Sequence, residues 1–101
     1  MNINIYTKYH IEKTVEYCYE DEEGDWLTKR EIKNVVLNGI DFLYEIEKSL
    51  QDIWLSNFIM KDNEISIESF NPENGKTNLT KWKVIDQENS VDLNELYNED
   101  F

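Results

Sequence analysis

The side chains best suited to nucleophilic chemistry are the single cysteine and the single histidine, Cys18 and His10. A cysteine nucleophile needs a base within hydrogen-bond reach. If one extended strand joins the two residues, they are separated by about 26 Å, at roughly 3.3 Å per residue. Only a chain reversal near Thr14 would bring them together, and no Gly-rich oxyanion or phosphate loop accompanies them. We therefore expect no catalytic residue, and a half-buried, space-filling role for Cys18.

Cation binding is a second chemistry to consider, at the stretch EDEEGD, residues 20–25, where five of six side chains are carboxylates. A calcium loop needs acids at alternate positions, a glycine sixth and a bidentate glutamate twelfth. Counted from Asp21, the glycine comes fourth and the twelfth residue is Ile32. We therefore expect no dedicated metal site and no cofactor. A pair of carboxylates acting as acid and base stays open, because 22 acids make chance pairs inevitable.

The nearest signal for nucleic-acid binding is the pair Lys81 and Lys83 around Trp82. Affinity for nucleic acid comes from Lys and Arg that neutralise phosphates, whereas this chain has 22 acids, 10 bases and a net charge of −12. Phosphates and anionic membranes both repel such a protein. We expect no direct contact with nucleic acid or membrane, a basic protein or a cation as partner, and Trp82 in the core.

Negative charge is concentrated at the two ends of the chain. Residues 1–25 hold seven acids against two lysines, and residues 86–101 hold six acids and no base. The sixty residues between them hold nine acids and eight bases, so they are close to neutral. Charge runs are usually solvated turns and tails. Because concentrated like charge costs folding stability, we favour a basic partner over solubility as the reason for these runs.

An extended segment would present the N-terminal acids in a row. Alternate residues of a strand project from one face about 6.6 Å apart, comparable to phosphates along a nucleic-acid strand. A row ending in the 20–25 turn could occupy a Lys/Arg-lined groove built for phosphates, with aromatic anchors. The residues predicted to contact this partner are Tyr6, Glu12, Glu16, Glu20, Asp21, Glu22, Glu23, Asp25, Trp26, Asp92 and Glu95. Tyr17, Tyr19 and Tyr97 are further candidate anchors, although the periodicity places Tyr17 and Tyr19 on the predicted core side.

Period-two alternation from Ile3 to Tyr19 predicts β structure with one buried face. It is either one long strand with a bend or two strands that meet near residues 12–14. Residues 20–25 then form a turn, in which Gly24 is free to adopt a positive φ. Trp26 begins either a return strand or the approach to a helix. Further strands are predicted over residues 58–60, 64–70 and 79–85, with a tight turn at 61–63 and a loop at 71–76.

Two helices are predicted in the middle of the chain. Residues 28–31 have capping-box spacing, and Asn38-Gly39 would end a helix over about 29–37. The β-branched residues of this segment leave a strand open as the alternative. Asp41 can cap a second helix over about 41–55, which carries an apolar stripe. A short helix around 93–97, docked or frayed, is also open.

Length and composition fit one domain with a real core, since 40% of the 101 residues are apolar. The element order predicts an α+β fold over residues 1–86: an antiparallel sheet of four to five strands with one or two helices on one face. Residues 87–101 form an acidic tail. With no apolar run of about 18 residues, no signal-like N-terminus and one cysteine, we expect a cytoplasmic protein. Twelve Asn, eleven Ile and no Ala indicate an AT-rich genome, bacterial or phage.

These features favour a non-enzymatic inhibitor that occupies the nucleic-acid-binding surface of a basic enzyme such as a nuclease. In size, acidity and α+β composition the chain is similar to small acidic anti-CRISPR proteins, although no motif is shared. An immunity protein that neutralises a nuclease toxin fits the same physics. Two other functions stay open: a regulatory adaptor that docks through residues 90–101, and a small enzyme that uses carboxylates, with or without a metal.

Overall fold

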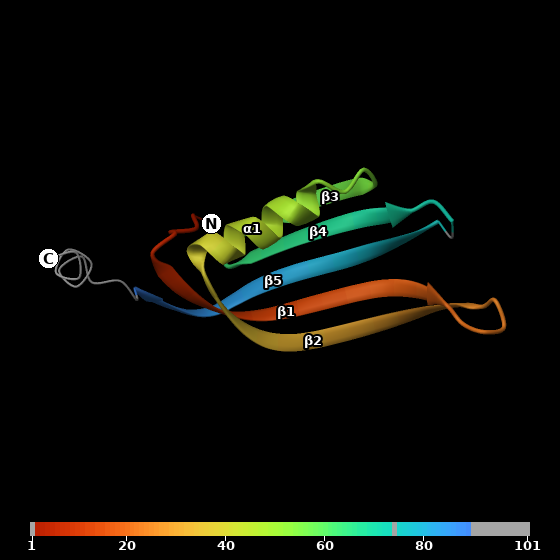
Figure 1. Cartoon of the computed structure of the whole chain (residues 1–101), viewed down its shortest axis with the longest axis horizontal. Coiled ribbons are helices and arrows are strands. Elements are labelled where there is room, and N and C mark those ends of the chain that lie inside the picture. The colour runs from red at the N-terminus through yellow and green to blue at the C-terminus, as the bar shows by residue number, and fades with distance from the viewer. Residues whose placement is uncertain (1, 74, 90–101) are drawn as a thin grey trace, which may run out of the picture.

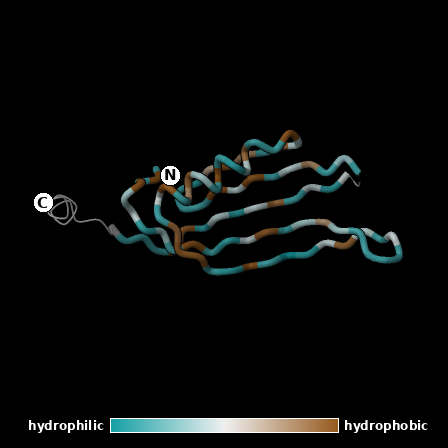
Figure 2. The backbone as a smooth tube through the Cα atoms, in the orientation of Figure 1, coloured by the Kyte–Doolittle hydropathy of each residue, from teal (hydrophilic) through white to brown (hydrophobic). Residues whose placement is uncertain are grey.

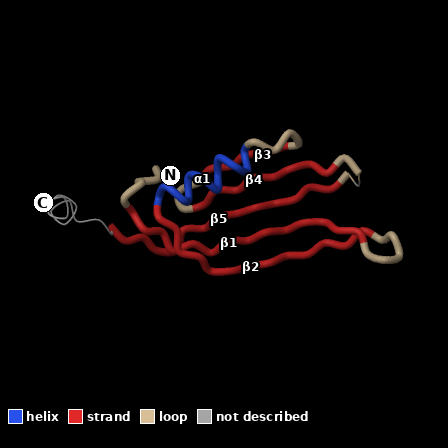
Figure 3. The backbone as a smooth tube through the Cα atoms, in the orientation of Figure 1, coloured by secondary structure: helices blue, strands red, loops and turns tan. Residues whose placement is uncertain are grey.

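A computed structural model describes residues 2–73 and 75–89 of the chain (Figure 1). The elements in chain order are β1 (Thr7–Glu20), β2 (Trp26–Asn38), α1 (Gly39–Leu50), β3 (Leu55–Met60), β4 (Glu64–Asn71) and β5 (Lys76–Asn89). The five strands form one antiparallel sheet in the order β2-β1-β5-β4-β3 (Figure 3). The α+β expectation is met, with a fold that is mostly sheet. Among the described helices, none has the length and apolarity to cross a membrane.

The sheet is built around β1, which is paired on both of its edges. Its register with β2 runs from Lys8 opposite Asn38 to Glu20 opposite Trp26. Pairing with β5 shifts between His10 and Ile11, where β5 contains one extra residue, a local bulge. β1 is nevertheless continuous from Thr7 to Glu20. Of the two alternatives left open by the alternation, the single long strand is therefore confirmed.

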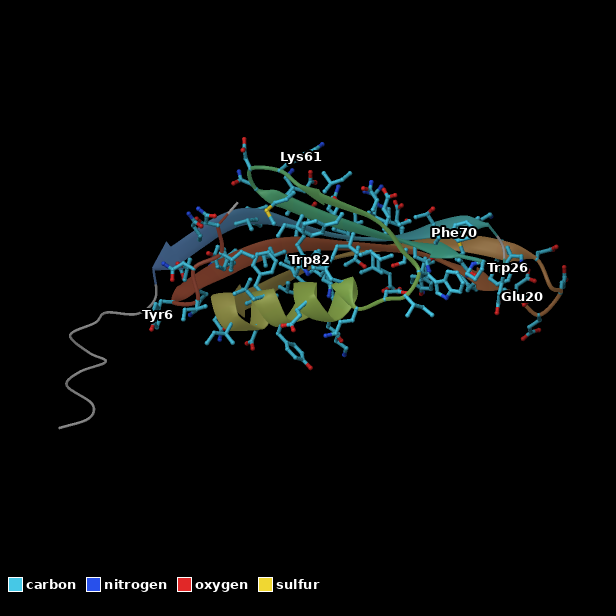
Figure 4. All side chains as sticks on the ribbon, turned by 90° about the horizontal axis from the view of Figure 1, so that it is seen from above. Tyr6, Glu20, Trp26, Lys61, Phe70 and Trp82 are labelled. Atoms are coloured by element: carbon cyan, nitrogen blue, oxygen red, sulfur yellow. The ribbon has the colours of Figure 1, made fainter. Side chains whose placement is uncertain are left out.

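Helix α1 lies against one face of the sheet and closes the core (Figure 4). The ring of Phe42 lies 5.5 Å from that of Tyr9 in an edge-on arrangement and 6.5 Å from that of Trp82. Such offset and edge-on pairs add to the stabilisation from burial alone. The core residues are Tyr9, Ile11, Phe42, Ile46, Ile65, Ile67 and Trp82. The prediction that Trp82 is a core residue is confirmed.

Two polar contacts to Glu45 cross the interface between helix and sheet. Lys13 Nζ donates to Glu45 Oε1 at 2.7 Å, and Trp82 Nε1 lies 3.4 Å from the same oxygen. The ammonium group also lies 5.6 Å from the centroid of the Trp82 ring, within the range of a cation–π contact. Lys13 can therefore lie within the apolar row of β1, because Glu45 of α1 neutralises its charge.

The predicted helix over 29–37 is wrong, because this segment forms most of β2. Thr28 is not an N-cap; it lies in the strand opposite Cys18. Ile32, Val35 and Val36 are β-branched and fit a strand paired with β1 better than a helix. The alternative that the sequence left open, a strand, is the one that forms.

The pair Asn38-Gly39 begins a helix rather than ending one. Asn38 Oδ1 accepts a hydrogen bond from the backbone N–H of Asp41 at 2.8 Å, as an N-cap does. The second predicted helix is thus confirmed but occupies Gly39–Leu50. The strands on both sides of the 61–63 turn are confirmed as β3 and β4. The strand predicted over 79–85 lies within a longer β5, which continues through residues 87–89, and residues 90–101 lie outside the described chain.

Gly39→Ala is expected to destabilise the fold by about 2–3 kcal/mol or more, as overpacking does. A Cβ at Gly39 would overlap the carbonyl oxygen of Asn4 and lie 2.6 Å from the Cα of Ile5. Both are backbone atoms that cannot rotate away. Urea unfolding measures the effect. Gly75→Ala is the comparison: its positive φ of 70° strains an L residue by about 1–2 kcal/mol, but no atom lies near the added Cβ, so it should lose less than Gly39→Ala. Equal losses in the two variants would contradict the close packing at Gly39.

Candidate functional site

The loop between β1 and β2 carries the densest negative charge in the described chain. We call its five carboxylate residues the acidic tip: Glu20, Asp21, Glu22, Glu23 and Asp25. The Asp21 N–H donates to the Asp25 carbonyl at 2.9 Å, and Asp21 Oδ1 accepts from the N–H groups of Glu23 and Asp25 at 3.0 and 2.8 Å. Gly24 adopts a φ of 86°, as the turn prediction expected. The loop is therefore ordered by its own backbone hydrogen bonds.

Three carboxylates of the acidic tip converge. Ligand oxygens of Asp21, Glu23 and Asp25 all lie within 4.8 Å of one another. Like charges at this distance repel, and two backbone N–H groups hold the Asp21 carboxylate in place. Oxygen ligands of this kind suit hard cations such as Ca²⁺. The spacing still departs from the calcium-loop template, and exposed acids often gather in this way without an ion.

The acidic tip projects beyond the rest of the sheet. The pairing of β1 with β5 ends at Glu16 opposite Leu79, whereas its pairing with β2 continues to Glu20. Beyond this ladder, the Cys18 N–H donates to Asn78 Oδ1 of β5 at 3.0 Å. Figure 1 shows the β1–β2 loop extending past the neighbouring loop, and Figure 2 shows it as hydrophilic. A partner can thus reach the acidic tip without displacing the core.

Glu12, Glu16 and Glu20 share the sheet face opposite α1, but they form a sparse row. They are four residues apart, or about 13 Å in a strand. Between them lie Thr14, which is buried, and Cys18, which is half-buried. This spacing is twice that of alternate residues, so the row reproduces the spacing of phosphates poorly.

Cations from neighbouring strands also lie beside Glu12 and Glu16 of this row. Arg30 Nε lies 3.4 Å from Glu16 Oε1, and Lys83 is the cross-strand neighbour of Glu12. On the same face Lys81 pairs with Glu64 at 3.3 Å. The face therefore carries mixed charge, as the near-neutral middle of the sequence implies. Sequence reasoning missed Arg30 and Lys83, because residues 29–37 were assigned to a helix and no strand register was known.

On the sheet face that carries Tyr17, the β2 cation near the acidic tip is Lys29, and it forms an ion pair with Glu31 of the same strand. Lys29 Nζ lies 3.4 Å from Glu31 Oε1, and this hydrogen bond, with a smaller contribution from Tyr17, raises the pKa of Lys29. Lys29 is fully charged at neutral pH and has its carboxylate partner within β2. It leaves the acidic tip unneutralised.

Aromatic side chains flank the acidic tip. The rings of Tyr17 and Tyr19 lie 6.2 Å apart on one face of the hairpin, and Tyr19 is opposite Leu27 in β2. Tyr19 and Leu27 are each about two-fifths exposed, whereas Trp26, opposite Glu20, is partly buried. Tyr6 is exposed but lies at the opposite end of the sheet from Glu20 and Trp26 (Figure 4). Tyr6 is therefore not brought together with the other candidate contacts.

The two acidic runs of the sequence do not merge into one patch. Asp86 and Glu88 lie on β5 beside the start of β1, where Glu88 Oε2 is 3.5 Å from His10 Nε2. The acidic tip lies at the far end of β1, a strand of 14 residues, about 46 Å long. Asp92, Glu95 and Tyr97, together with the proposed helix around 93–97, lie outside the described residues. What the structure groups is the acidic tip with Trp26, Tyr19 and Leu27.

The geometry does not support a Cys18–His10 dyad. Both residues lie on the continuous strand β1, eight positions apart, and no chain reversal occurs near Thr14. Cys18 Sγ instead lies 3.8 Å from Thr28 Oγ1.

Comparison of the chain with protein-family models, curated proteins and solved structures finds no match.

Asp21→Ala is expected to loosen the acidic tip, because two backbone N–H groups lose their acceptor, at a cost of about 1–3 kcal/mol locally. Amide hydrogen exchange followed by NMR should show faster exchange at Glu23 and Asp25. Asp21→Asn keeps a side-chain carbonyl acceptor and should retain most of the protection. Exchange that is equally fast in the two variants would show that the Asp21 oxygen does not order the loop.

Proposed function

We propose that this protein is a non-enzymatic inhibitor that inserts the acidic tip into the phosphate-binding groove of a nucleic-acid enzyme, most simply a nuclease. The observation that carries this proposal is the acidic tip itself. Five carboxylates stand at the projecting end of a hairpin, and three of them have oxygens within 4.8 Å of one another. No cation of the described chain is paired with any of the five.

A groove that binds phosphates suits such a tip chemically. Its Lys and Arg side chains form short, charge-assisted hydrogen bonds with carboxylates as they do with phosphates. The hydrogen bonds to Asp21 fix the loop before binding, so little conformational entropy is lost on association. The concentrated charge also attracts a basic partner at long range and speeds encounter.

The apolar side chains beside the acidic tip can supply binding energy through burial, in addition to the electrostatic attraction. Interface energy is usually concentrated in a few buried aromatic or apolar anchors. Tyr19, Leu27 and Trp26 lie directly behind the acidic tip on the two faces of the hairpin. In this proposal the carboxylates set the position on the partner and the apolar anchors slow dissociation.

Two biological settings fit the same surface. One is a phage or mobile-element protein that blocks a host defence nuclease, and the other is an immunity protein that neutralises a nuclease toxin. The AT-rich composition favours the first, and in both the protein acts in the bacterial cytoplasm. The adaptor alternative depends on residues 90–101, outside the described chain, whereas the proposal here depends on residues 19–27.

Reversing the charge of the acidic tip is expected to weaken partner binding strongly. Glu22 and Glu23 are chosen because their side chains are exposed and make none of the loop's ordering hydrogen bonds. Glu22→Lys/Glu23→Lys should weaken affinity by about 100-fold or more, because two attractive pairs become repulsive. The control Glu47→Lys/Asp62→Lys changes the net charge equally at exposed sites away from the hairpin and should bind normally.

The measurement uses the two variants and the wild-type protein as matched baits in host-cell lysate. Proteins retained by the wild type and the control, but lost from the tip variant, are purified and tested for competition with duplex DNA and RNA. Affinity should fall steeply between about 50 and 500 mM salt, as screening predicts. A partner that binds all three baits equally, or binds together with nucleic acid, would contradict the proposed function.

A further inference from the structure

The two edges of the sheet are treated differently by the sequence. Edge strands expose unpaired backbone groups, and natural proteins commonly protect them with charged side chains. The β2 edge follows this rule, with Lys29, Arg30, Glu31 and Lys33 in its middle. The β3 edge, Leu55–Met60, has the sequence LSNFIM and contains no charge. The β3 edge therefore lacks the protection that the β2 edge has.

Apolar side chains project from both faces of β3. Phe58 and Met60 stand on the α1 side, opposite the buried Ile67 and Ile65 of β4. Ile59 stands on the other side, opposite Ser66. Phe58, Ile59 and Met60 are between 37% and 47% exposed, a large fraction for three consecutive apolar residues. Exposed apolar side chains gathered along one strand edge in this way are typical of an interaction site.

The backbone of β3 is also ready for a further strand. The Lys61 N–H donates to the Glu64 carbonyl at 2.8 Å and closes the turn to β4. Since N–H and C=O groups alternate in direction along an antiparallel strand, those of Ile59 point to β4. Those of Phe58 and Met60 point away from the sheet. Beyond β3 the described chain places no other strand (Figure 1).

We propose that β3 pairs with β3 of a second copy of this chain, antiparallel about a two-fold axis at Ile59. In this register Phe58 lies opposite the partner's Met60 and exchanges two hydrogen bonds with it. The two-fold axis generates a second pair, of Met60 with the partner's Phe58. Ile59 lies beside the partner's Ile59 on the sheet face opposite α1. Lys61 falls opposite the partner's Asn57, so no like charges oppose one another. The result is one continuous antiparallel sheet across the dimer, an isologous interface.

Charge explains why the occupant is a second copy and not the basic partner of the acidic tip. A basic surface gains no electrostatic energy at a strand without charge, whereas apolar pairs favour a self-complementary contact. Two copies with a net charge of −12 each repel. The two-fold axis directs the two acidic tips to opposite ends of the joined sheet, farther apart than the screening length of about 10 Å. Two copies that pair through the uncharged β3 edge therefore keep the electrostatic repulsion between them small.

The test is the mass of the full-length protein by sedimentation equilibrium across a concentration series. The monomer mass is 12.2 kDa, and we expect twice this mass at high concentration. Ile59→Lys should raise the dimer dissociation constant by about 100-fold, because two lysines then oppose each other at the axis. Ile32→Lys is the matched control on the β2 edge, where Ile32 is also exposed, and should dimerise as the wild type does.

Two further readouts separate this proposal from its rivals. Added salt should strengthen the dimer by screening charge repulsion, whereas it weakens partner binding through the acidic tip. Hydrogen exchange at the Phe58 and Met60 amides should slow as concentration rises. A wild-type protein that stays monomeric at about 0.5 mM, a range where weak dimers form, would overturn the proposal. So would concentration-independent protection of these two amides, which would mean that the β3 edge is covered within one chain.

Discussion

The pairing of β1 with β2 is the constraint on which the rest of the structure depends. Thirteen residue pairs, from Lys8–Asn38 to Glu20–Trp26, fix the register of the two strands. A shift by one residue would move every side chain to the opposite face. This register places Tyr9 and Ile11 under α1 and at the same time places the acidic loop at the distal end of the hairpin. Core and candidate site are therefore set by one ladder of hydrogen bonds.

The folded chain redistributes the charge of the sequence into three regions. The acidic tip is strongly negative, the sheet face opposite α1 is mixed, and the β5 end carries Asp86 and Glu88 near His10. In the first of these regions, acids without a cation partner lie beside the partly exposed side chains of Tyr19 and Leu27. The acidic tip attracts a cationic surface to the hairpin end of the sheet. The two acidic runs of the sequence therefore do not form one binding patch, and the proposed partner site is limited to the β1–β2 hairpin.

Local pattern predicted those elements whose side-chain period was unambiguous. Alternation marked β1, the Gly24 turn followed from its composition, and the apolar stripe marked α1, whose N-cap is Asn38 and not the predicted Asp41. The segment 29–37 failed because capping-box spacing and β-branched residues conflicted, and pairing with β1, a tertiary interaction, decided the outcome. That one error hid the position of Arg30 opposite Glu16. The acidic tip could be predicted from sequence, whereas the cations beside the row of glutamates and the separation of Tyr6 required the register.

In the proposed function the hairpin end, and no other surface of the described chain, contacts the basic partner. Chemical-shift mapping of the isotope-labelled protein, titrated with the partner captured through the acidic tip, tests it most directly. We predict that the perturbed amides lie within residues 16–30, strongest at the loop, and that Tyr6, Lys8 and Asp86 are unaffected. Perturbations centred on the β5 end, on α1 or on the mixed face would contradict this account.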